Sequence, residues 1–470
     1  MATAIYPHAN KPVVRRHDLD IVDRHGLGFA LLLATTATLF VRPADLVPAF
    51  KDWPIYQVLI LGCAALSVRA CSRQLSNVSL VNRPDTVSLL VLLVAVGVSH
   101  LAHGFIWAAR ASMFEAGKLI VLYVLISALV NTPRRLAFFI KWLAIAISFM
   151  ATLALLDNFS ILSIAAFEAI EDRGIINDGA TGPVERIRGT GIFQDPNDFG
   201  LILVTGLALC SSFLTKPGLG ILRYLWLVPI GVLISALALT HSRGALLSLL
   251  CAISMALCYF HGKKAIFLIA PIVPIMALVF SHRMADYNAI NHGTGQERIQ
   301  IWSDSLNVWR QYPLFGLGEG LIVDEIGIVT HNSFLHCYAE LGFFGGTAFL
   351  ACFLVVGLNL WSGRRIESQS NKVSAEASRE VKEHRRICGF VFAALMGCTA
   401  SMLTISRQFV APTYLILGLA SAANTLPLES ALLDRARHLK LNNRFVVLST
   451  ITSIGALLTF YVVVRLFVRW

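Results

Sequence analysis

Residues 333–361, SFLHCYAELGFFGGTAFLACFLVVGLNLW, form a long apolar run in which Glu340 is the only charged side chain. A helix of about 20 apolar residues crosses the roughly 30 Å hydrocarbon core of a bilayer, so this run is long enough to span a membrane. Further runs that approach or reach this length begin near Leu27, Ile55, Val87, Ala111, Arg135, Pro196, Leu222, Ser242, Ala265, Ile387, Phe409 and Phe445. The sequence therefore predicts an all-α, polytopic integral membrane protein with about 12–13 transmembrane helices.

The composition agrees with a membrane protein and argues against several other classes. Hydrophobic residues make up 56% of the 470 residues and charged residues 14%, which is more apolar surface than a soluble domain can bury. The formal charge of +11 has no basic, aromatic-rich pattern beside it, so we expect no nucleic-acid partner. The nine cysteines lie mostly inside apolar runs without C-x-x-C spacing, so neither a disulfide framework nor a zinc site is predicted.

Basic residues set the predicted orientation, because the cytoplasmic loops of membrane proteins collect Lys and Arg. Threading the spans from a cytoplasmic N-terminus places about 25 basic residues inside and about 13 outside, and nearly all of the outer ones are Arg. Basic residues precede the run near Leu27, which favours an uncleaved first span over a cleaved signal peptide. The resulting segments are a cytoplasmic tail (1–26), N-terminal transmembrane helices (27–156), an outer loop (157–195), a large outer loop (282–332), a transmembrane helix (333–361), a cytoplasmic linker (362–386) and C-terminal transmembrane helices (387–470).

The large outer loop contains a predicted helix. We expect this helix to lie along the membrane surface with its tryptophans inward, and to end before Pro313. The glycine-rich run at 316–320 is predicted to be flexible. The apolar residues that recur at three- and four-residue spacing, as on one face of a helix, are Ile299, Trp302, Leu306 and Trp309.

The first cluster of candidate site residues precedes the span that follows the first outer loop. Asp195 is expected to cap that helix, with a proline at the first helical position, and Asn197 lies beside it. Arg186 and Arg188 flank a glycine-rich turn and suit an anion, with lipid headgroups as the alternative ligand. Asp195 and Asp198 have no histidine or third acid nearby, so no metal site is predicted.

Two further arginines stand at helix starts on the same predicted side. Arg243 lies in the tight turn 241–244 between two spans, where it either snorkels to headgroups or faces a pocket. Gly244 would let a neighbouring segment or a ligand approach closely. Arg298 lies near the start of the loop helix, where a positive charge opposes the helix dipole but favours an anion. Pairing with Glu297 is the alternative for Arg298.

Histidines follow the large loop, where the chain re-enters the membrane. His331 precedes Asn332, and histidine exchanges protons near neutral pH, so His331 is a candidate base; a capping role is the alternative. His336 lies deeper in the span and is expected to be hydrogen-bonded there. Glu115 and Lys118 lie about one turn apart in another span, so they are expected to neutralise each other or to line a polar cavity.

In order, spacing and predicted sidedness, these clusters resemble the superfamily of bacterial O-antigen ligases and O-antigen polymerases, over about residues 186–346. The resemblance implies a bacterial inner-membrane protein, with its N-terminus in the cytoplasm and its site and large loop in the periplasm. The motifs that carry it are Gly189-Thr190-Gly191-Ile192-Phe193, Asp195-Pro196-Asn197, Ser242-Arg243-Gly244, Arg298 to Trp302, Pro313 to Gly318, and His331-Asn332 up to Glu340-Leu341-Gly342.

The resemblance also implies a reaction. The donor would be an undecaprenyl-diphosphate-linked glycan, transferred without metal or other cofactor to a glycan, a lipid A core or a protein, among membrane lipids. Negative charge develops on the leaving pyrophosphate, which fixed guanidinium groups would stabilise. The expected site comprises His331 at the acceptor hydroxyl, Arg243 and Arg298 at the pyrophosphate, the less closely matching Arg186 and Arg188 beside them, and Asp195, Asn197 and Asn332 in support.

Two other classes of function stay open on the sequence alone. A transporter for a small anion would use the same arginines, but such proteins place their charges and broken helices near the bilayer midplane. The arginines here lie at the predicted outer boundary instead. A non-catalytic scaffold would tolerate replacement of all of these residues.

Overall fold

The computed structural model describes residues 26–46, 48–50, 53–175, 181–279, 294–364, 375–426 and 439–468. Parts of several predicted segments therefore lie outside the described residues. Among them are the N-terminal tail with its basic residues, the first part of the large loop and residues 365–374 of the linker.

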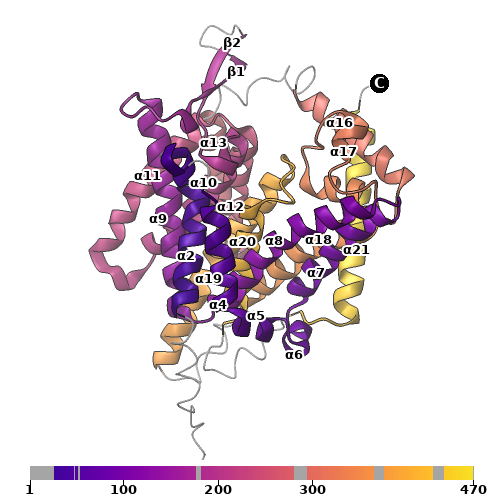
Figure 1. Ribbon diagram of the computed structural model, residues 1–470. Coiled ribbons are helices and arrows are strands. Elements are labelled where there is room, and N and C mark those ends of the chain that lie inside the picture. The colour runs from indigo at the N-terminus through magenta and orange to yellow at the C-terminus, as the bar shows by residue number, and fades with distance from the viewer. Residues whose placement is uncertain are drawn as a thin grey trace, which may run out of the picture.

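Each apolar run of the sequence is helical in the structure (Figure 1). The corresponding helices are α2 (Gly26–Phe40), α4 (Ile55–Leu66), α7 (Pro84–Leu101), α8 (Ile106–Leu129), α9 (Pro133–Asn158), α10 (Pro196–Leu214), α11 (Leu227–Leu239), α12 (Arg243–His261), α13 (Ala265–Val279), α18 (Ser333–Gly363), α19 (Ala375–Met402), α20 (Ala411–Asn424) and α21 (Asn443–Phe467). Shorter or more polar helices are α3 (Pro43–Leu46), α5 (Val68–Gln74), α6 (Asn77–Val81), α16 (Thr294–Gln311) and α17 (Ile322–Ile326).

The protein is a multi-pass, helical membrane protein. Among the described residues, 8 helices are long and apolar enough to cross a membrane, or 9 if α4 and α5, bent by 72°, form one broken span. This count is lower than the 12–13 spans expected from the sequence. Residues Arg243–Ile272 form one span where we expected two. Helices α2 and α20, with 15 and 14 residues, and the apolar part of α19 from Ile387 to Met402 are shorter than a full crossing.

The central helix of the bundle carries the first candidate cluster at its start. In α10, 83% of the spanning window is buried, against 17% in α21. A helix that is apolar all round is stable when protein surrounds it, and α10 packs against α9, α11, α12 and α19. The cluster around residues 195–198 therefore lies in the middle of the molecule.

A two-stranded hairpin stands on the loop before α10. Strands β1 (Ile170–Ile175) and β2 (Thr181–Arg186) are antiparallel, and Ile170 pairs with Arg186 at the base of the hairpin. The end of the bundle that carries these strands, at the top of Figure 1, is named the hairpin end here. Arg186 is the last residue of β2, so the hairpin fixes where this arginine emerges.

The predicted loop helix is confirmed as α16, although it packs on protein. Leu306 is buried, and the Trp302 ring meets Phe460 of α21 edge-on at 6.1 Å. Helix α16 also packs against α18. We expected its tryptophans to face the membrane, but the apolar face is partly covered by α18 and α21, which fixes the position of Arg298 at its start.

The glycine-rich run after α16 is docked on α18, contrary to the predicted flexibility. Backbone N–H groups of Leu317 and Gly318 donate to the carbonyls of Ala339 and Glu340 at 3.0 and 2.9 Å. The chain of α18 bends at Gly342, whose φ of +65° lies in the left-handed region that favours glycine. This backbone ladder holds the end of the large loop against the membrane helix.

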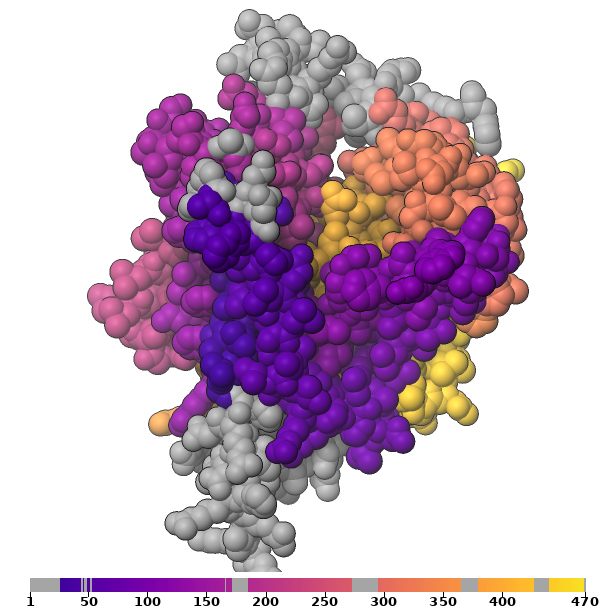
Figure 2. All heavy atoms as spheres, in the orientation of Figure 1, coloured from indigo at the N-terminus to yellow at the C-terminus, as the bar shows by residue number. Residues whose placement is uncertain are grey.

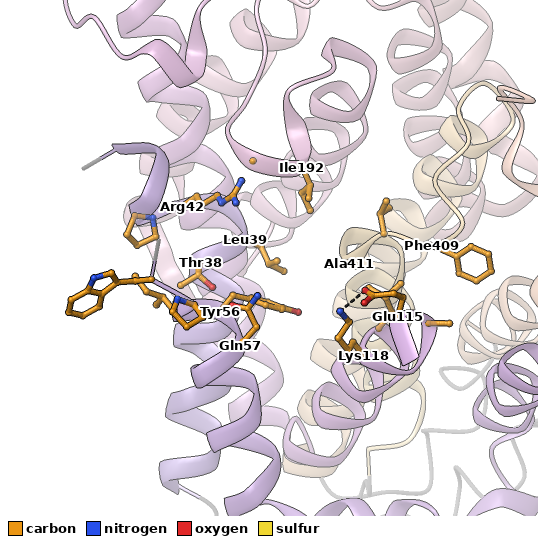
Figure 3. A pocket seen from close by; sticks show the side chains of 18 of the residues that line it. Thr38, Leu39, Arg42, Tyr56, Gln57, Glu115, Lys118, Ile192, Phe409 and Ala411 are labelled. Carbon is orange, nitrogen blue, oxygen red and sulfur yellow. Dashed lines mark ion pairs between the residues drawn. The ribbon is translucent and has the colours of Figure 1, made fainter. Parts of the chain in front are cut away.

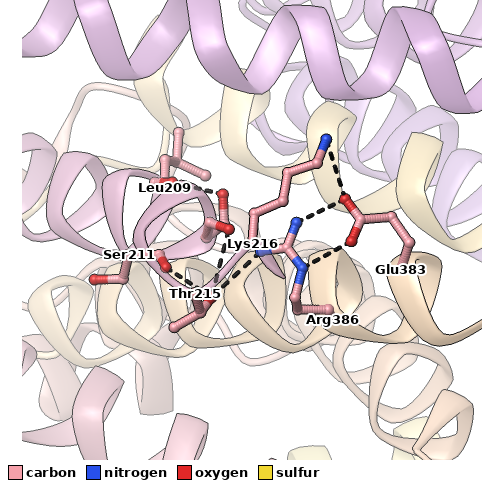
Figure 4. A network of polar contacts seen from close by, with 7 residues as sticks. Leu209, Ser211, Thr215, Lys216, Glu383 and Arg386 are labelled. Carbon is pink, nitrogen blue, oxygen red and sulfur yellow. Dashed lines mark hydrogen bonds and ion pairs between the residues drawn. The ribbon is translucent and has the colours of Figure 1, made fainter. Parts of the chain in front are cut away.

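At the end of the bundle opposite the hairpin end, a network of polar side chains links α19 to the end of α10 (Figure 4). Glu383 of α19 pairs with Arg386 at 2.7 Å and with Lys216, just after α10, at 3.5 Å. Arg386 also donates to the Thr215 hydroxyl at 3.3 Å. The second half of the predicted linker therefore belongs to helix α19, anchored to the end of α10.

Candidate functional site

Asn197 connects two of the predicted clusters at the hairpin end. Asp195 is the N-cap of α10, its carboxylate accepting from the Asn197 backbone N–H at 2.7 Å, so the predicted cap is confirmed. The side-chain oxygen of Asn197 accepts from the Arg186 guanidinium at 3.3 Å and from the Ser242 hydroxyl at 2.7 Å. Arg186 also donates to the Thr240 carbonyl at 2.9 Å. The end of β2 is thereby held beside the turn before α12.

Arg243 is the first residue of α12, and its side chain is exposed. Ser242 caps this helix by accepting a hydrogen bond from the Ala245 N–H at 3.2 Å. A Cβ atom on Gly244 would overlap the side chain of Thr404. The close approach expected at Gly244 is therefore made by the segment that follows α19.

Arg298, in the first turns of α16, belongs to the same cluster. Burial lowers the pKa of its guanidinium, and the positive charges of Arg243 and Arg186 lower it further, whereas Asp195 raises it. Charges perturb one another's pKa strongly only at short range. The structure therefore brings together arginines from β2, α12 and α16 around one carboxylate, and such crowded cations are stabilised by a bound anion.

His331 lies beside these arginines, directly before α18. Burial lowers the pKa of its imidazole, and the charges of Arg298 and Arg407 lower it further, with Asp195 opposing them. Its φ of +53° lies in the left-handed region, which a non-glycine residue enters at a cost of about 1 kcal/mol or more. The imidazole is therefore held neutral near pH 7, in a strained position at the edge of the cluster.

Arg407, which follows α19, is a further residue of the cluster that we did not predict from the sequence. Its Nε donates to Asp198 Oδ1 of α10 at 2.6 Å. Although burial alone would lower the pKa of this guanidinium, the hydrogen bond and the charge of Asp198 raise it. The hydroxyl of Ser333 accepts from the Arg407 backbone N–H at 2.8 Å and donates to the Ile405 carbonyl at 2.7 Å. The start of α18, and with it His331, is thus tied to α10 through Arg407.

The signal for Arg407 was a polar triplet, 406–408, inside an otherwise apolar stretch. We divided that stretch into two spans and gave the triplet no role. Asp198, weighed as a metal ligand, is paired with Arg407 instead.

His336 is hydrogen-bonded, as predicted for a histidine inside the span. Its Nδ1 lies 3.0 Å from the Ser406 hydroxyl, and its Nε2 lies 3.0 Å from Glu340 Oε1. Glu340 also accepts from the Ile322 backbone N–H at 3.3 Å. A buried chain of polar groups thus extends from the segment carrying Arg407 into α18.

Two predicted residues have other surroundings. Arg188 is not among the charges that shift the pKa of Arg298 or His331, and its buried Nε has no hydrogen-bond partner in the described part of the chain. Asn332 is the N-cap of α18, and its Oδ1 accepts from two backbone N–H groups at 3.1 Å. Its buried Nδ2 has no partner within the described ranges.

Comparison with known proteins assigns this part of the chain. Residues 229–350 match the O-antigen ligase family. The chain carries an O-antigen ligase domain. It is also similar to an O-antigen polymerase of Salmonella muenchen, with 29% identity over 179 residues, which are 34% of this chain and 44% of that relative. The chain thus matches less than half the length of the curated relative.

The O-antigen ligase domain contains four of the predicted site residues, Arg243, Arg298, His331 and Asn332. Arg186 and Arg407 lie outside it and complete the cluster from neighbouring segments. Over the described residues, no group of three or more His, Cys, Asp or Glu side chains is arranged to hold a metal ion. The charged groups gathered around His331 are mostly guanidinium groups, and planar guanidinium groups bind phosphate oxygens two at a time.

Proposed function

We propose that this protein transfers a glycan from an undecaprenyl-diphosphate carrier to an acceptor hydroxyl, at the periplasmic face of a bacterial inner membrane. One observation supports this most strongly. Arg243 lies close enough to Arg298 to lower the pKa of its guanidinium, and burial with the charges of Arg298 and Arg407 lowers the pKa of the neighbouring His331. The similarity to O-antigen ligases and to an O-antigen polymerase agrees with that reaction.

The arginines would bind the pyrophosphate of the donor. When the bond between the anomeric carbon and the phosphate oxygen breaks, the electron pair leaves with the lipid diphosphate, and its negative charge grows. Guanidinium groups that are already in place stabilise this charge without reorganising, and they act more strongly in a site with little water. We propose that Arg243 and Arg298 supply this stabilisation, with Arg186 in support, and that the transfer needs no metal.

His331 would act on the acceptor. The oxygen of the acceptor hydroxyl forms the new bond to the anomeric carbon, and its proton passes to the neutral imidazole. Proton transfer of this kind accelerates a reaction by roughly 10²–10⁴-fold. The acceptor, whether a growing glycan, a lipid A core or a protein, would be chosen by surfaces outside the arginine cluster.

The test is a set of single substitutions with a matched control. Arg243→Ala, Arg298→Ala and His331→Ala are each expected to abolish glycan transfer while the protein still accumulates in the membrane. The control is Arg310→Ala, which removes an exposed arginine from the same helix α16, far from the cluster, and is expected to retain transfer. Near-normal transfer by all three site variants would refute the proposal.

A further inference from the structure

A polar cavity lies at the side of α2, α4 and α8, outside the arginine cluster. Its volume is about 710 Å³, within the roughly 300–1,000 Å³ typical of pockets for small ligands. In Figure 2 the surface is hollowed between the indigo N-terminal helices and the purple α7–α8 pair. One wall comes from α2 and α4, and the opposite wall from α8 and the start of α20 (Figure 3).

The lining combines ion-paired and neutral hydrogen-bonding groups. Glu115 and Lys118 of α8 pair with each other, as predicted, and both face the cavity (Figure 3). Arg42 and Glu319 are the other charged residues that line it among those described. The formal charges of two basic and two acidic side chains therefore cancel, whereas the arginine cluster has an excess of positive charge. Such a surface suits a ligand without net charge.

The neutral groups in the lining fit a sugar. Tyr56, Gln57 and Thr38 provide hydroxyl and amide groups on the wall formed by α2 and α4. Trp53 adds an aromatic ring, and it is 63% exposed. Hydroxyls that both donate and accept are matched by hydroxyls, amides and carboxylates, and an aromatic face packs on the C–H groups of a sugar ring. A purely hydrocarbon ligand would leave the charged pair at Glu115 without polar contact.

The cavity continues towards the proposed catalytic residues. Ile192 and Val410 line it and also line a small pocket whose wall includes Arg407. Arg407 is close enough to lower the pKa of His331. Glu319, which lines the cavity, also lies within electrostatic range of His336. The cavity and the segment that carries Arg407 are therefore neighbours, with Ile192 and Val410 between them.

We propose that this cavity binds the uncharged sugar end of the acceptor and presents its hydroxyl towards His331. The inference rests on the proposed transfer reaction, because it assigns the second substrate of that reaction. The donor pyrophosphate would occupy the arginine cluster, so the two substrates would meet where the cavity joins the cluster. Acceptor selection would then depend on α2, α4 and α8, which lie outside the O-antigen ligase domain.

The experiment introduces a large side chain into the cavity and leaves the arginine cluster unchanged. Gln57→Trp places a large ring in the cavity, and Val58→Trp places the same ring at the next position, where the side chain is 63% exposed and does not line the cavity. Initial rates are measured on purified full-length protein with a lipid-linked donor and a neutral oligosaccharide acceptor, varying each in turn. Gln57→Trp is expected to raise the KM for the acceptor roughly tenfold or more, with the KM for the donor unchanged. Val58→Trp is expected to behave like the unmodified protein.

The outcomes separate the two proposals. If the unmodified protein transfers no glycan, the proposed function fails. If it does, and Gln57→Trp leaves the KM for the acceptor unchanged, the cavity assignment is overturned. An increase confined to the KM for the donor, larger for longer lipid tails, would assign the cavity to the carrier lipid and would also overturn it.

Discussion

Replacing Arg407 with methionine is expected to destabilise the protein by about 2–3 kcal/mol, because the Asp198 carboxylate loses its partner. The two groups lie 2.6 Å apart, and their side chains are 35% and 7% exposed. Removing one member of a fully buried pair costs roughly 3–5 kcal/mol, since the remaining charge is stranded. Water reaches Arg407 in part and screens the pair, which lowers the expected figure.

The assay is a double-mutant cycle of Arg407→Met, Asp198→Asn and the combined variant, with unfolding followed in detergent micelles. Asp198→Asn is expected to lower the free energy of unfolding less than Arg407→Met does. The guanidinium that Asp198→Asn leaves unpaired can reach water, whereas the carboxylate that Arg407→Met leaves unpaired cannot. The combined variant is expected to be about 2 kcal/mol more stable than the sum of the two single effects predicts. Additive effects, or equal losses in the two single variants, would refute the reasoning that a buried ion pair joins α10 to the segment before α20.

Two further predictions concern His331. In the proposed reaction His331 acts in its neutral form, and burial with the charges of Arg298 and Arg407 lowers the pKa of its imidazole below the usual 6.5. The rate is therefore expected to fall only on acidification below about pH 6.5. Arg298→Gln removes a charge that lowers the pKa of His331, so the pH below which the residual rate falls should move upward. A pH–rate profile in which that pH does not change would contradict the electrostatic contact. Because φ is +53° at this position, His331→Gly should be more stable than His331→Ala by about 1 kcal/mol, with both inactive. Unfolding in micelles compares the two, and equal stabilities would show that the backbone is not strained.

Much of the fold could be predicted because membrane spans are a local property of the sequence. The length of an apolar run predicts a helix whatever surrounds it, so the runs near Pro196 and Ser333 became α10 and α18. The cap at Asp195 and the helix around Trp302 were predictable for the same reason, since both depend on residues within one or two turns.

The rest depended on which helices are neighbours, which periodicity does not encode. Arg407 gains its role only because Asp198, more than 200 positions earlier, lies across from it in the bundle. The hairpin that positions Arg186 arises in a polar loop without alternating apolar residues. Nothing in the sequence indicates that the backbone of residues 313–318 packs against Gly342, as it does in the structure.

The central claim is that Arg243 and Arg298 bind one pyrophosphate, beside a histidine that acts on the other substrate. The most direct test is the affinity of undecaprenyl diphosphate, carrying no glycan, for the protein in lipid nanodiscs. We predict that Arg243→Gln and Arg298→Gln each weaken binding by roughly tenfold or more, as expected for the loss of a charge-assisted hydrogen bond, and that His331→Ala binds normally. Unchanged affinity in the double Arg243→Gln, Arg298→Gln variant would contradict the account.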